Sequence, residues 1–155
     1  MVEIEFDDKE LRDQLTKLQR ASQEYEGYEV GFFENSRYDD GTQVAMVAAA
    51  NEFGIQFDKT QRKIPSRPFF RNANKKVVKK LVDLLAESLE KSLTYILSKQ
   101  DMNRLGAAHQ GAIQKEIRDL KEPPNAPETI ARKGSENPLI ASGTMRRSVT
   151  YKIIK

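Results

Sequence analysis

Residues 71–98 carry apolar side chains with the spacing of an α-helix, and this pattern constrains the fold more than any other. Lysines occupy the opposite side of the helical projection, which is typical of a helix with one buried face. At 1.5 Å per residue the helix would be about 40 Å long. The apolar residues are Val77, Val78, Leu81, Leu84, Leu85, Leu89, Ile96 and Leu97, and the lysines are Lys75, Lys76, Lys79 and Lys80.

Three further helices are predicted from the same periodicity. One runs from a capping Asp101 to Leu120, with an apolar face that includes Met102, Leu105, Ile113 and Ile117. Another covers Lys9–Ser22 behind Asp7 or Asp8 as the cap. The alanine-rich segment Gln43–Phe53 forms a short helix, with Thr42 as the expected cap and Gly54 as the residue that ends it.

Alternation of apolar and polar residues predicts strands at Val2–Phe6, Tyr28–Phe32 and Ser148–Ile154. Residues 55–64 are expected to form a hairpin or a mobile loop, and residues 122–138, with four prolines, a long loop. This order of elements predicts an α+β fold in a single domain spanning residues 1–155. A small, mostly antiparallel sheet would be packed on one face by helices, with one long helix and extended loops.

Composition excludes several classes of site. The 155 residues include no cysteine, so a disulfide framework, a thiolate zinc site and a cysteine nucleophile are ruled out. The single histidine, His109, is expected to be a packing or surface residue. The paired carboxylates Asp7–Asp8 and Asp39–Asp40 fall at an expected helix start and turn, and no phosphate-binding glycine motif is present. We therefore expect no catalytic residue, no metal and no cofactor.

No apolar run approaches the length of a membrane span, and the first 20 residues lack the apolar core of a signal peptide. Synthesis in the cytoplasm without membrane insertion is the expectation. Charge is divided unevenly along the chain. Residues 1–40 hold 5 basic and 12 acidic residues (−7), and residues 41–155 hold 21 and 11 (+10), which together give the net +3. This asymmetry suits head-to-tail packing of copies in a ring, or an ordinary solvated surface.

Two stretches carry a more specific signal. The first is VAAANEFG (Val47–Gly54) followed by IPSRPFFRNA (Ile64–Ala73), and the second is PPNAPETIARKGSENPLIASGTMRRSVTY (Pro123–Tyr151). Together they resemble the small virion-morphogenesis proteins of tailed phages, known as tail-completion, neck or tail-component proteins. In that family the last stretch reads L-I-D-T-G, whereas this chain has Ala141 and Ser142 in place of the aspartate and threonine and keeps Gly143.

The resemblance implies a structural protein of the virion, assembled in the bacterial host cytoplasm and located at the head–tail junction. Its copies would form a hexameric or dodecameric ring that joins the tail to the head connector and lets genomic DNA pass. The implied partners are head-side connector or adaptor proteins and a tail terminator, tube or sheath protein. Residues 55–64 and 122–138 are the candidate docking loops. The contact residues expected there and beside them are Phe57, Lys59, Arg62, Lys63, Arg67, Asn125, Arg132 and Lys133.

Two other functions fit parts of the sequence. The basic residues within 62–80 suit a non-specific DNA-binding protein whose affinity falls steeply with salt. A wall-degrading hydrolase of the virion would need a pair of carboxylates in a cleft, and no spacing in the chain singles out such a pair.

Overall fold

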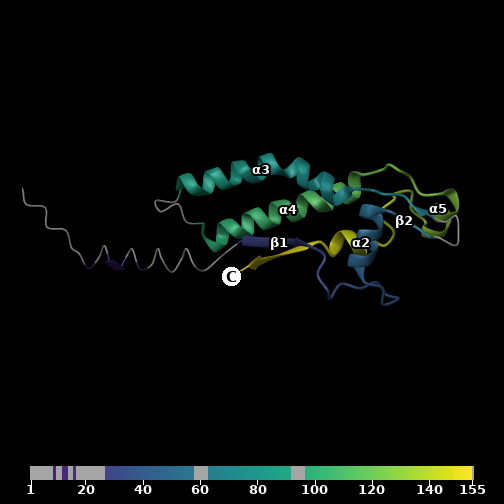
Figure 1. Cartoon of the computed structure of the whole chain (residues 1–155), viewed down its shortest axis with the longest axis horizontal. Helices are drawn as coiled ribbons and strands as arrows, with labels where there is room; N and C mark the ends of the chain where they lie inside the picture. The colour runs from purple at the N-terminus through teal and green to yellow at the C-terminus, as the bar shows by residue number, and fades with distance from the viewer. Residues whose placement is uncertain are drawn as a thin grey trace, which may run out of the picture.

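The computed structural model describes residues 27–57, 63–91 and 97–154, together with positions 9, 12, 13 and 16. The described part is elongated, with two long helices side by side along its length (Figure 1). The elements are β1 (Gly27–Gly31), α2 (Val44–Phe53), β2 (Ile55–Gln56), β3 (Lys63–Ile64), α3 (Phe69–Lys91), α4 (Lys99–Asp119), α5 (Pro127–Lys133), α6 (Thr144–Arg147) and β4 (Thr150–Ile154).

The packing of α3 against α4 forms the main interface of the fold. Buried apolar residues from both helices meet along it, and they include Val77, Met102, Leu105, Ile113 and Ile117. The predicted long helix is therefore confirmed, but two of its details were wrong. Val78 was assigned to the buried stripe and is 57% exposed. The helix was also predicted to reach Ser98, which instead begins the next helix.

Ser98 is the N-cap of α4, a role that the sequence analysis gave to Asp101. The Ser98 hydroxyl accepts a hydrogen bond from the backbone N–H of Asp101, and the Asp101 carboxylate accepts one from the backbone N–H of Ser98. This reciprocal capping box satisfies two N–H groups that a helix start leaves unpaired. Both residue types favour caps, so composition alone did not separate the two positions. In α2 the N-cap is likewise Gln43, without a side-chain hydrogen bond, rather than Thr42.

The α+β class is confirmed, with the strands divided between two small antiparallel sheets. In one, β1 pairs with β4 in a register that places Gly27 opposite Ile154 and Gly31 opposite Thr150. This ribbon lies along α4, on the side away from α3 (Figure 1). An isolated two-stranded ribbon is marginal in water, so its contact with α4 is what stabilises it. Gly106 of α4 allows this contact, because a Cβ at this position would overlap the ring of Tyr151.

The second sheet is the hairpin of β2 and β3, with Ile55 opposite Ile64 and Gln56 opposite Lys63. Of the two alternatives for residues 55–64, the hairpin is the one that forms. Residues 122–138 are not a continuous loop, because α5 lies within them. Pro127 occupies the first turn of α5, where its missing N–H costs nothing, and Gly134 ends the helix in the left-handed conformation at φ 65°. The prolines that predicted a loop here include one that starts a helix.

The main core gathers where α2, α3, α4 and the C-terminal segment meet. Its members are Val44, Ala48, Phe69, Ala73, Ile113, Ile117, Leu120, Leu139, Met145 and Val149. Phe32, next to β1, packs edge-on against Phe69 with ring centroids 6.2 Å apart. Two stretches resemble the tail-completion family: Val47–Gly54 with Ile64–Ala73, and Pro123–Tyr151. The core therefore includes residues from both of these family-like stretches.

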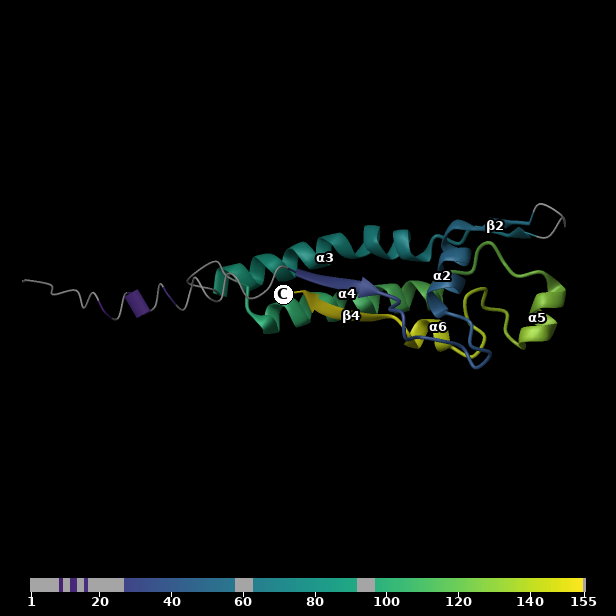
Figure 2. The same ribbon diagram turned by 60° about the horizontal axis from the view of Figure 1, so that its bottom comes forward.

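Near the N-terminus, Lys9, Arg12, Asp13 and Thr16 are helical, as predicted for that segment, whereas the predicted strand Val2–Phe6 lies outside the described residues. None of the helices in the described part is long and apolar enough to cross a membrane. In both views the β2–β3 hairpin and α5 lie at the same end of the molecule (Figures 1 and 2). The two candidate docking segments, far apart in sequence, are therefore neighbours in space.

Candidate functional site

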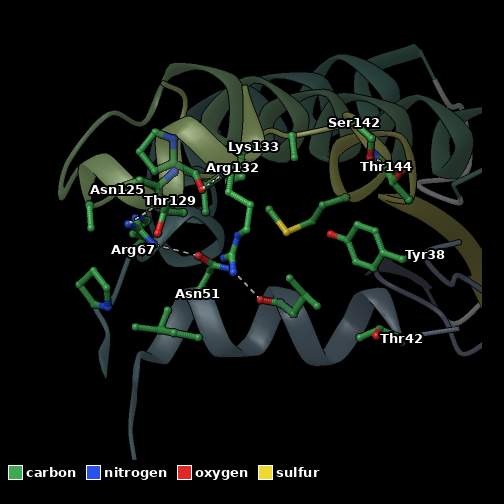
Figure 3. Close-up of a pocket in the computed structure, with 18 of the residues that line it drawn as sticks. Tyr38, Thr42, Asn51, Arg67, Asn125, Thr129, Arg132, Lys133, Ser142 and Thr144 are labelled. Atoms are coloured by element: carbon green, nitrogen blue, oxygen red, sulfur yellow. Dashed lines mark hydrogen bonds between the residues drawn. The ribbon is translucent and has the colours of Figure 1, made fainter. Parts of the chain in front are cut away.

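Arg67 joins the two family-like stretches. Its side chain is buried, with only 3% exposed, at the extended segment between β3 and α3. Nη1 donates to Asn51 Oδ1 at 3.1 Å, within the same stretch. In the second stretch, Nε donates to the carbonyl oxygen of Pro123 at 2.8 Å. Nη2 donates to the carbonyl oxygen of Pro124 and to Asn125 Oδ1, both at 3.1 Å. Arg67, Asn51 and Asn125 lie together in Figure 3. One guanidinium thus holds the chain after α4 against the end of α2.

Glu52 fixes the start of α3. The residue is 5% exposed, and its carboxylate accepts hydrogen bonds from the backbone N–H groups of Phe70 (2.8 Å) and Arg71 (3.2 Å). It also forms an ion pair with Arg71 Nε at 2.8 Å. A carboxylate at a helix N-terminus satisfies unpaired N–H groups and complements the helix dipole. Glu52 therefore sets the position of α3 relative to α2.

Gly54 permits the sharp turn between α2 and the hairpin. Its φ of 78° lies in the left-handed region, and a Cβ there would be 2.9 Å from the Ile64 carbonyl oxygen and the Ser66 nitrogen. The neighbouring Phe53 is exposed, with the Arg71 guanidinium 5.4 Å from its ring centroid. The conformation at Gly54, which was predicted to end the helix, determines where the hairpin projects.

The second stretch is held by Lys133 and Asn137. Lys133 Nζ donates to the carbonyl oxygens of Asn137 (3.2 Å) and Pro138 (3.0 Å). Asn137 donates to the Arg118 carbonyl at the end of α4 and accepts from the backbone N–H of Leu139. Leu139 then enters the core. Gly143 follows in the left-handed conformation at φ 80° and serves as the N-cap of α6.

A cavity of about 740 Å³ opens between the two stretches. Arg67, Asn51 and Asn125 gather at one end of it, while Tyr38, Thr42 and Thr144 lie at the other (Figure 3). Its rim also carries the cationic residues Lys63, Arg132 and Lys133. One carboxylate, Asp40, lines the wall, where it accepts a hydrogen bond from the backbone N–H of Thr42. This bond lowers the pKa of Asp40.

Arg67 and Lys133 donate their side-chain hydrogen bonds to neutral oxygens among the described residues. Within the described part of the chain, no carboxylate forms an ion pair with Arg67, Arg132 or Lys133. Burial lowers the pKa of Lys133, and repulsion from Arg67 and Arg132 lowers it further. Burial also lowers the pKa of Arg67. The Nδ2 group of Asn125 is a buried donor without a hydrogen-bond partner. The cavity therefore offers positive charge and an unused donor.

A smaller cavity of about 560 Å³ lies on the other side of Lys63 and Arg132, between the hairpin and α5. It brings together three of the predicted contact residues, because Phe57, Lys63 and Arg132 all line it. Phe57 is 47% exposed there. Lys59 and Arg62 lie outside the described residues.

Three predicted contact residues, Arg67, Asn125 and Lys133, form hydrogen bonds within the protein. The structure buries Arg67 and bonds it to Asn125, so the guanidinium holds segments together and presents almost no surface. Sequence reasoning grouped Arg67 with the surface residues because a buried arginine within a basic run looks like an exposed one. The importance of Glu52 was missed, although an acid that ends a short helix before a proline-rich segment is a weak signal of a cap for the next helix.

Other candidate sites have ordinary structural roles. His109 is partly buried, with Nε2 2.7 Å from Asn74 Oδ1 and Nδ1 3.2 Å from the Tyr28 hydroxyl. One neutral tautomer satisfies both contacts, which fits a packing histidine, and burial lowers its pKa. Among the described residues no group of His, Asp or Glu is arranged to hold a metal ion.

Comparison with models of protein families, with curated proteins and with solved structures finds no match for this chain.

Proposed function

We propose that this protein is a structural component of a tailed-phage virion, forming a ring at the head–tail junction that joins the tail to the head connector. The observation that carries the proposal is the joining of its two family-like stretches through Arg67. Each distinctive residue in them has a scaffold role: Asn51 and Asn125 bind Arg67, Glu52 caps α3, and Gly54 and Gly143 form turns. Because these distinctive residues stabilise the fold, they support a structural protein that acts through its surfaces.

The surfaces that it presents support the same proposal. The hairpin and α5 project at one end of an elongated body (Figure 1), and an exposed Phe57 lies beside Lys63 and Arg132 there. Aromatic residues and arginine are enriched in protein contacts. We assign this end of the molecule to contacts with neighbouring ring proteins, with genomic DNA passing through the lumen.

Copy number in the particle tests this function. Purified phage particles are digested, and the protein is quantified by mass spectrometry against the portal protein as an internal standard. Six or twelve copies per particle are expected for a ring. Hundreds of copies would move the protein to the tube, sheath or capsid, and its absence from the particle would overturn the structural function.

A matched pair of variants tests the docking end. Phe57→Ser at the hairpin is expected to reduce head–tail joining in an in vitro assembly assay. Val78→Ser on α3 removes a side chain of similar exposure (57% against 47%) away from that end, and it is expected to leave joining unchanged. Equal losses in both variants would show that the hairpin has no special part in docking.

DNA binding by residues 62–80 remains the alternative, but the structure leaves it fewer free charges than the sequence suggested. Arg67 is buried, Arg71 pairs with Glu52, and Lys76 pairs with Glu116 at 2.6 Å. Lys75, Lys79 and Lys80 remain exposed on α3. If this face were the functional one, removing these three lysines would abolish duplex binding and flatten its salt dependence.

A further inference from the structure

The cavity between the two stretches carries more positive charge than the described residues neutralise through ion pairs. Arg67 is buried, with only 3% of its surface exposed, and all its side-chain partners are neutral oxygens. A buried charge is costly unless an opposite charge or full hydrogen bonding compensates it. The hydrogen bonds engage four of the five guanidinium N–H groups but leave the positive charge in place, and Arg132 and Lys133 line the same cavity.

The chemistry of the cavity selects an anion that enters on a flexible chain. The nearest carboxylate in the wall, Asp40, is committed to the N–H of Thr42. The unpaired Asn125 Nδ2 adds a neutral donor beside the cations. A rigid duplex cannot place its phosphates in a recess between two loops, whereas an extended peptide can insert a side chain. Carboxylates on a polypeptide therefore fit better than a nucleic acid.

The chain itself supplies a segment of this chemistry. Residues 1–8 contain four carboxylates, at Glu3, Glu5, Asp7 and Asp8, and no lysine or arginine. Residues 1–40 carry a charge of −7 against +10 for the remainder. The strand β1, the first element of the described fold, lies toward the end of the molecule opposite α5 (Figure 1). In a head-to-tail arrangement, the acidic segment of one copy would therefore be offered to the cavity of the next.

We infer that the cavity lined by Arg67, Arg132 and Lys133 is a receptor for the acidic N-terminal segment of a second copy of this chain. Carboxylates of that segment supply the counterions that the cavity lacks. This inference rests on the proposed ring, because it names the contact that links neighbouring copies. It differs from the docking contacts of the hairpin, which face other proteins.

Zero-length cross-linking of mixed isotopes tests the inference on the full chain. Protein labelled with ¹⁴N is mixed with protein labelled with ¹⁵N at high concentration, and a carbodiimide couples carboxylates to amines in contact. Mass spectrometry is expected to find mixed-isotope cross-links between residues 1–8 and Lys63 or Lys133. Same-isotope cross-links alone would mean that the segment folds back on its own chain, and would overturn the inference. Absence of cross-links at these lysines would overturn it too.

Charge-matched variants separate a built site from general attraction. Arg132→Gln is expected to reduce the mixed-isotope yield about fivefold, because it removes a charge at the rim. Lys80→Gln removes one exposed charge from α3 and is expected to leave the yield unchanged. Equal reductions would indicate non-specific attraction and overturn the inference. A variant of the N-terminal segment replaces its four carboxylates: Glu3→Gln/Glu5→Gln/Asp7→Asn/Asp8→Asn. If inorganic phosphate or duplex DNA protects Lys133 from chemical labelling of its amine, and this variant leaves that labelling unchanged, the cavity takes phosphate instead.

The outcomes remain distinct from those of the particle experiment. Cross-links between copies in a protein that is absent from the particle would overturn the neck function and keep the contact between copies. Six or twelve copies in the particle without these cross-links would keep the neck function and remove this contact.

Discussion

Replacing Arg67 by methionine is expected to destabilise the fold substantially. The variant keeps most of the apolar stem but removes four side-chain hydrogen bonds, to Asn51, Pro123, Pro124 and Asn125. Each such bond contributes about 0.5–1.5 kcal/mol net, and an acceptor left buried costs about 1–3 kcal/mol. Water in the adjoining cavity can solvate some of these acceptors. We therefore expect a loss of about 3–5 kcal/mol.

Urea denaturation followed by far-UV circular dichroism measures this loss, since the long helices dominate the signal. At about 2–4 °C per kcal/mol for a protein of this size, the thermal midpoint should fall by roughly 10 °C. Arg132→Met is the control, because Arg132 is exposed, and its effect should stay within about 0.5 kcal/mol. A loss below about 1 kcal/mol in the Arg67 variant would refute the view that this guanidinium holds the two stretches together.

Three further predictions concern the helices and the histidine. Gly106→Ala should lower the free energy of unfolding by about 1–3 kcal/mol through overlap with Tyr151. Gly111→Ala, with open space around it, should raise the free energy of unfolding by up to about 1 kcal/mol. Urea midpoints that move in the same direction in both variants would contradict this. Ser98→Ala should cost about 1 kcal/mol by removing the cap of α4, measured by the same unfolding curves. Burial lowers the pKa of His109 below its usual 6.5, so as the pH falls the imidazole is protonated in the unfolded chain before it is protonated in the folded one. The free energy of unfolding should therefore fall as pH drops below about 6.5. His109→Gln should weaken that fall, measured from about pH 7.5 to about 5.5.

Periodicity predicted the helical part of this fold well, because the signal is repeated over many residues. The inward face of α4 appears in the core, with Ile113 and Ile117 among its most buried members. In the predicted stripe of α3, Val77 is buried, whereas Leu81, Leu84, Leu85 and Leu89 are half-buried. The limits of the helices were less predictable. Whether Ser98 or Asp101 caps α4 depends on which backbone position turns extended, and both side chains suit that role.

The site was harder to predict, since its properties arise from contacts between distant segments. The sequence shows Arg67 in a run of basic residues, and only the return of residues 123–125 to the same place buries it. Phe57, Lys63 and Arg132 were predicted as contact residues, but their meeting at one cavity depends on the hairpin lying beside α5. Neither periodicity nor composition contains this information.

The same network therefore sets both the stability and the geometry of the docking end. Arg67 fixes residues 123–125, which lead directly into α5, and Glu52 fixes the start of α3 beside the hairpin. A change at Arg67 should consequently impair assembly by displacing α5, even though the residue itself presents almost no surface. Arg132, on the exposed side of α5, should affect contacts without affecting unfolding. If variants at Arg67 and Arg132 both fold normally and only the Arg132 variant alters cross-linking, the cavity binds its partner through its rim. If Arg67→Lys, which keeps the charge, retains cross-linking but loses stability, the buried charge itself attracts the partner.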